Sequence, residues 1–133
     1  MATENQQINF IHTFNMDSDF PDISSLLVKA GEENLYQKLI GQLNKDLNFA
    51  NIDEEYADNI LPEKLKRDMH ELIFRLINEK FADYLNLLYI IDVPEKQVKQ
   101  LDGSDVVKLS EEVAFLILKR EWQKVWFKNK YDM

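Results

Sequence analysis

The sequence of 133 residues contains no cysteine, only two histidines and only three glycines. Without cysteine the chain has no disulfide framework, no cysteine-based zinc site and no thiol nucleophile. The loops that cradle phosphate groups need several glycines where the backbone approaches the ligand, so three glycines also disfavour those loops. These scarcities remove the enzyme and binding classes that are easiest to recognise from sequence.

Long apolar runs are missing as well. No stretch of about 18 apolar residues is available to span a bilayer, and the N-terminal sequence MATENQQINF lacks the basic and apolar pattern of a signal peptide. We therefore expect a soluble, cytoplasmic protein that does not contact membranes. A chain of this length can bury one core, so we expect residues 1–133 to form a single helical domain.

The clearest pattern in the sequence runs from Pro62 to Ile91 and predicts one long helix. Its apolar residues recur at helical spacing and cover about half of the circumference, which is more than a helix lying on one neighbour needs. Pro62 and Glu63 suit the first turn of a helix. We expect this helix to touch at least two others. Its predicted apolar arc contains Leu65, Met69, Leu72, Ile73, Leu76, Ile77, Phe81, Tyr84 and Leu88.

The rest of the chain predicts shorter helices. Asp19 is a candidate N-cap for a helix over 22–30, and either Ser104 or Ser110 is a candidate N-cap for the last helix. The predicted fold is all-α. It is an irregular bundle of about four main helices, with a short extra helix after Pro94 and an extended N-terminal arm over 1–18; the main helices are expected near 22–30, 32–48, 62–91 and 105–128.

Motifs for catalysis or metal binding are absent from the sequence. His70 is next to Glu71, but adjacent helical residues point about 100° apart and cannot act together. Di-iron helical bundles need a Glu-x-x-His motif, and the chain has none. We expect no catalytic residue, no metal and no cofactor.

Asp83 falls inside the predicted apolar arc, near Leu76 and Leu87. A buried unpaired charge is costly, so we expect Asp83 to pair with Lys80 or with a basic residue of another helix. The alternative is a carboxylate that faces a ligand in a small cleft.

The last predicted helix carries the most distinctive group of residues. Aromatic and basic side chains alternate near its end, and Trp and Arg are enriched at binding hot spots. A Trp stripe at helical spacing is also typical of a core. We predict that this end of the helix binds a partner, through Trp122, Lys124, Trp126 and Lys128.

Charge is unevenly distributed along the chain. The net charge is −8, and residues 1–60 carry 3 Lys against 11 Asp and Glu. A net acidic chain repels nucleic acid, so that partner is disfavoured. We expect a protein-protein interaction or adaptor protein without catalytic activity, whose partner is another protein or a second copy in a homodimer. The alternatives are an enzyme or small-ligand binder with an unrecognised site, and an acidic mimic of nucleic acid.

Overall fold

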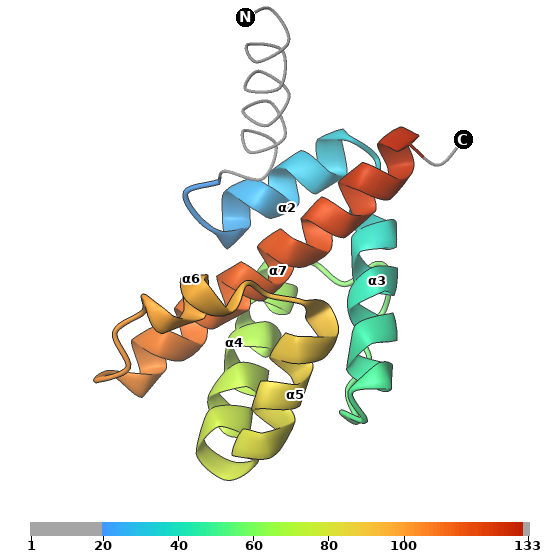
Figure 1. The fold of residues 1–133 in the computed structure, drawn as a ribbon. Coiled ribbons are helices and arrows are strands. Elements are labelled where there is room, and N and C mark those ends of the chain that lie inside the picture. Colours follow the sequence, from blue (N-terminus) through green and yellow to red (C-terminus); the bar gives the residue numbers. More distant parts are fainter. Residues whose placement is uncertain (1–19, 132–133) are drawn as a thin grey trace, which may run out of the picture.

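The computed structural model describes residues 20–131, and this part of the chain contains six helices and no strand (Figure 1). The predicted all-α fold is confirmed. The predicted N-terminal arm and the candidate N-cap Asp19 lie outside the described residues. The helices are α2 (Ile23–Glu32), α3 (Tyr36–Phe49), α4 (Pro62–Glu79), α5 (Phe81–Ile91), α6 (Glu95–Lys99) and α7 (Val106–Tyr131).

The centre of the fold is α7, not the segment after Pro62 that dominates the sequence. This helix crosses the molecule and packs against α2, α3, α4 and α5 (Figure 1). Its middle turns are buried on most sides, since Val113, Ala114, Ile117 and Leu118 are all inaccessible to solvent. The α7 helix therefore contributes side chains to most of the core.

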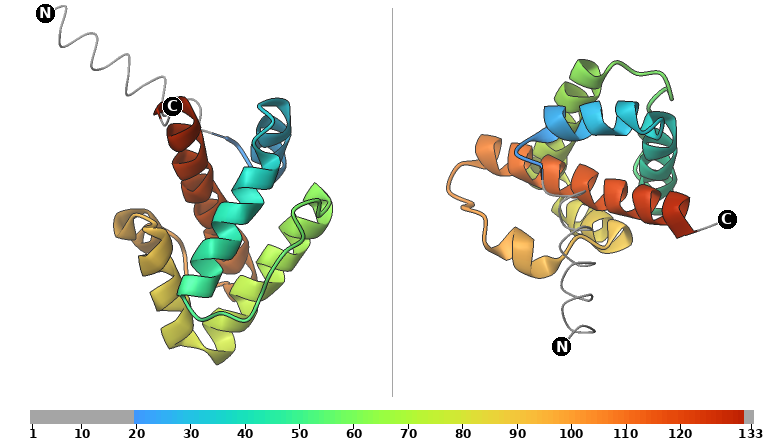
Figure 2. Two further views of the ribbon diagram at one scale, coloured as in Figure 1. Left: turned by 90° about the vertical axis from the view of Figure 1, so that its right-hand side faces the viewer. Right: turned by 90° about the horizontal axis from the view of Figure 1, so that it is seen from above.

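The single helix predicted over 62–91 is wrong, because the helix breaks at Lys80. The backbone of Lys80 has φ −141° and ψ 64°, outside the helical region, so α4 ends there and α5 begins. The two helices form a V, and α3 lies in front of the V in the same view (Figure 2, left). A straight helix would be about 45 Å long and would leave the domain. The break instead lets both halves pack against α7.

Two helix starts also differ from the predicted ones. Asp22 is the N-cap of α2, and its carboxylate accepts a hydrogen bond of 2.8 Å from the backbone N–H of Ser25. Before α7, the Asp105 carboxylate accepts from the backbone N–H of Lys108 at 3.2 Å, whereas Ser110 lies inside the helix. Both cases follow the ordinary preference for Asp at this position.

Candidate functional site

The four predicted partner-binding residues do not share one exposed surface. Trp122 is fully buried and makes an edge-on contact with Phe20, at 6.5 Å between ring centroids. Trp126 is partly buried against the core. Lys128 is exposed and lines a shallow pocket of about 370 Å³, together with Lys38, Gln42, Val125 and Asn129. The structure therefore places Trp122 in the core.

Lys124, the fourth predicted residue, forms ion pairs inside the molecule. Its Nζ lies 2.9 Å from Oδ2 of Asp46 on α3 and 3.3 Å from Oε1 of Glu121 on α7. Gln42 Nε2 donates to the same Asp46 oxygen at 3.2 Å. Lys124 thus joins α3 to α7 rather than pointing freely into solvent.

Glu121 is the most unusual group of this buried cluster. Its side chain is fully buried, and within the described residues neither carboxylate oxygen has a donor in hydrogen-bond geometry. Burial and, after it, the neighbouring Asp46 raise its pKa from 4.5 to about 9, although the Lys124 ammonium acts to lower it. At neutral pH the Glu121 carboxyl therefore keeps its proton, which it can donate to Asp46.

Asp46 titrates in the opposite direction. Burial acts to raise the pKa of this carboxyl, but the neighbouring Glu121 carboxyl and the hydrogen bonds from Lys124 and Gln42 outweigh burial and lower it. The two carboxyl groups thus share one proton, held on Glu121, beside one ammonium group. Such an arrangement neutralises the cluster, which explains how two acids can be buried between packed helices.

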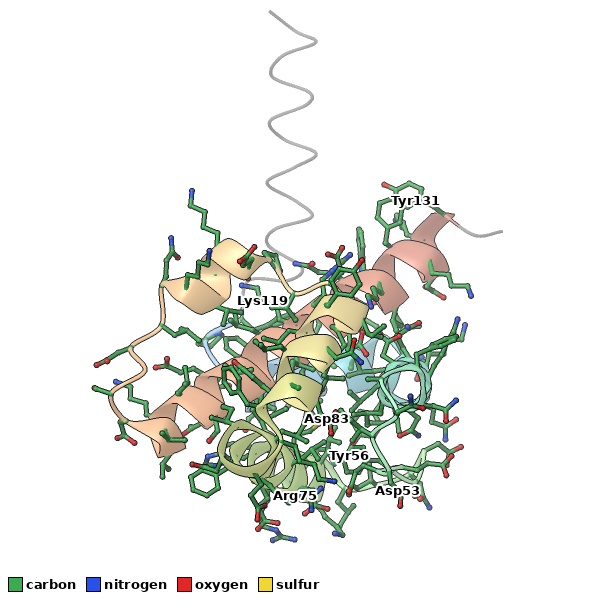
Figure 3. All side chains as sticks on the ribbon, turned by 60° about the horizontal axis from the view of Figure 1, so that its bottom comes forward. Asp53, Tyr56, Arg75, Asp83, Lys119 and Tyr131 are labelled. Atoms are coloured by element: carbon green, nitrogen blue, oxygen red, sulfur yellow. The ribbon has the colours of Figure 1, made fainter. Side chains whose placement is uncertain are left out.

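Asp83 lies in the first turn of α5, where a negative charge suits the positive end of the helix dipole (Figure 3). It is only partly buried, and no hydrogen bond or ion pair of Asp83 is found within residues 20–131. The expected buried partner is thus not present in this part of the chain.

We expect Asp83→Asn to change the free energy of unfolding by less than ~1 kcal/mol, since it removes only a favourable interaction with the helix dipole. Chemical unfolding of the parent and the variant measures the difference. A loss of about 2 to 3 kcal/mol, as when a buried group loses its partner, would show instead that Asp83 has a buried partner.

The outer face of α5 carries three large apolar side chains at spacing i, i+4, i+8. Phe81, Leu85 and Tyr89 are 54%, 50% and 82% exposed, while the opposite face of the same helix buries Tyr84, Leu87 and Ile91. Ala82 and Asn86, beside this stripe, are exposed and uncharged. We call Phe81, Leu85 and Tyr89 the α5 stripe. It is an apolar helix face without a covering helix in the described structure.

A groove of about 520 Å³ continues from the α5 stripe toward α6. Its walls are mainly apolar, and all three of its charged residues are in ion pairs. Arg120 Nη2 lies 3.3 Å from the Asp92 carboxylate, and the Glu95 carboxylate pairs with Lys99 at 3.0 Å. The groove is lined by Leu85, Leu88, Tyr89, Asp92, Val93, Pro94, Glu95, Val98 and Lys99.

Other polar groups have structural roles. The Nε2 atom of His70 lies 3.0 Å from the carbonyl oxygen of Val107, which ties α4 to the start of α7. Within residues 20–131 no three histidine or carboxylate side chains come together as metal ligands. Nor does any helix of this part of the chain combine the length and apolar character that a membrane crossing requires.

Comparisons with models of protein families, with curated proteins and with solved structures found no match for this chain. The candidate sites are therefore defined by geometry alone: a buried acid cluster between α3 and α7, and an exposed apolar surface on α5 and α6.

Proposed function

We propose that the protein is a non-catalytic interaction protein that binds an apolar face of another helix through the α5 stripe. The observation that carries this proposal is the exposure of three large apolar side chains along one face of an otherwise well-packed helix. Contiguous apolar surface of this kind marks interaction sites, and residues spaced by four are the usual anchors between helices.

The chemistry of the groove also favours binding over catalysis. A catalytic pocket brings several polar groups to bear on one point. Here the walls are mainly apolar, and the lining carboxylates Asp92 and Glu95 are paired with Arg120 and Lys99.

The predicted binding surface on α7 is less well supported than the α5 stripe. A partner could reach Trp122 only if α7 left the core, because this side chain is fully buried. Lys128 and the partly buried Trp126 stay accessible near the C-terminal end of α7. We therefore propose α5, and not α7, as the interaction surface.

We expect a photo-reactive p-benzoylphenylalanine in place of Tyr89 to cross-link a discrete partner in the cell that makes this protein. Tyr89 is the most exposed member of the α5 stripe, so the reactive ring would lie against whatever covers it. The products are separated by gel electrophoresis and identified by mass spectrometry.

The control carries the same photo-reactive residue in place of Val28, which is 60% exposed on α2. A discrete band at position 89 and none at position 28 supports the proposal. No band at position 89, or the same diffuse products at both positions, contradicts it. Washing with high salt before irradiation tests the nature of the contact. A cross-linked product that still forms after this wash indicates an apolar contact, whereas the charge-driven binding of an acidic mimic would be lost.

A further inference from the structure

We propose that the helix that covers the α5 stripe is α5 of a second copy, packed antiparallel across a two-fold axis that passes near Leu85. This inference rests on the proposed function, because it names the partner of the same surface. A two-fold interface uses one patch on both copies, so the patch must be complementary to itself. The α5 stripe meets this requirement in three ways.

The first is the spacing of the stripe. Leu85 is at its middle, with Phe81 four residues before and Tyr89 four residues after. A two-fold axis at Leu85, perpendicular to the helix, brings the two Leu85 side chains together. It also sets Phe81 of each copy against Tyr89 of the other. Every large apolar side chain of the stripe then meets an apolar side chain.

The second is the position of the groove. It lies beside the C-terminal half of α5, between Tyr89, Val93 and Val98, whereas the exposed ring of Phe81 projects at the N-terminal end. The two positions are about 12 Å apart along the helix, at 1.5 Å per residue. Antiparallel packing brings Phe81 of each copy to the groove of the other. The contact between Phe81 of one copy and the groove of the other therefore occurs twice in each dimer.

The third is charge at the ends of the stripe. Lys80 precedes the stripe and is exposed, and Asp92 follows it with a carboxylate that is 80% exposed despite its contact with Arg120. The same two-fold axis sets Lys80 of one copy opposite residue 90 of the other. That position is about 3 Å along the helix from Asp92, a distance that a lysine side chain can span. The antiparallel arrangement also places opposite ends of the two helix dipoles together.

The contact area is small, because one helix face and one groove provide it. Interfaces of this class are weak, so we expect a dissociation constant in the micromolar range. Sedimentation of the full chain should show a reversible monomer–dimer equilibrium as its concentration is raised. Leu85→Asp should raise the dissociation constant at least tenfold while leaving the helical circular-dichroism signal unchanged, since Leu85 is half exposed.

The absence of cysteine makes a direct test of the geometry possible. Leu85→Cys should form a disulfide between copies under mild oxidation, because the two residues meet at the axis and a disulfide needs Cβ atoms about 4 Å apart. Val28→Cys, on another exposed face, is the control. Phe81→Cys and Tyr89→Cys should each cross-link poorly alone and well when mixed. A parallel pair would give the opposite result.

A second copy is ruled out if the parent chain sediments as a monomer at every concentration and Leu85→Cys cross-links no faster than Val28→Cys. The proposed function is then judged separately by the photo-reactive residue at position 89. A cross-link to a different protein keeps the α5 stripe as an interaction surface and assigns it to that partner. Failure of both experiments removes the proposed function as well.

Discussion

Glu121→Gln is expected to flatten the pH dependence of stability and to stabilise the protein above neutral pH. Burial raises the pKa of Glu121 from 4.5 to about 9 in the folded protein. Between these values the folded chain holds a proton that the unfolded chain releases. The free energy of unfolding of the parent therefore falls as pH rises from 4.5 to about 9, by something on the order of 1 kcal/mol for each pH unit.

Glutamine is suited to this test because it cannot ionise and its amide still has protons to donate to Asp46. Urea unfolding at pH 5, 7 and 9 measures the difference between parent and variant. The control is Glu111→Gln, which removes an exposed carboxylate from the same helix. Asp46 affects the free energy of unfolding only at low pH. Its pKa is lowered in the folded protein, so the stability that it contributes is lost as the pH falls below 3.8, the ordinary pKa of an Asp carboxyl. Parallel profiles for Glu121→Gln and the parent would mean that Glu121 is ionised in the folded state.

Leu76→Asp is expected to abolish cooperative folding. Leu76 is 2% exposed on the inner face of α4. A carboxylate at this position would lie among packed apolar side chains without a partner, at a cost comparable to the whole stability of a small domain. Thermal melting followed by circular dichroism should show no sharp transition.

The matched control for this change is Arg75→Ala, at the neighbouring position. The Arg75 guanidinium is exposed and lies 3.7 Å from the Glu54 carboxylate, and exposed ion pairs of this kind contribute little. The control should change the free energy of unfolding by less than ~0.5 kcal/mol. Equal effects of the two substitutions would show that the inner face of α4 is assigned incorrectly.

The inner face of α4 could be predicted because it follows from local periodicity. Leu65, Met69, Leu72, Ile73 and Leu76 recur at helical spacing, and all five are buried as expected. The break at Lys80 could not be predicted in this way, since neither proline nor glycine marks it. Packing against α7 overrides the continuous pattern. As a result Phe81, which was predicted to be in the apolar arc, is exposed.

The sequence carries a signal for the buried acid cluster. Glu121 is four residues after Ile117 and three after Leu118, so it belongs to the buried side of α7. Asp46 is likewise three residues after Leu43 on α3. On each of the two helices a carboxylate occupies a position where the helical periodicity predicts a buried apolar side chain. This pattern indicates that each carboxylate needs a buried partner. Which helices meet is a property of the tertiary structure, so the pairing itself could not be read from either helix alone.

The break at Lys80 also separates the rotational phases of α4 and α5. In a continuous helix every residue fixes the direction of all later ones, since each step turns the chain by about 100°. At Lys80 the backbone leaves the helical conformation, and the rotation of α5 is set by its contacts with α3, α4 and α7 instead of by the helical phase of α4. Changes on the exposed face of α4 therefore need not turn the α5 stripe. The α5 stripe can therefore keep facing outward while the exposed face of α4, the other arm of the V, changes.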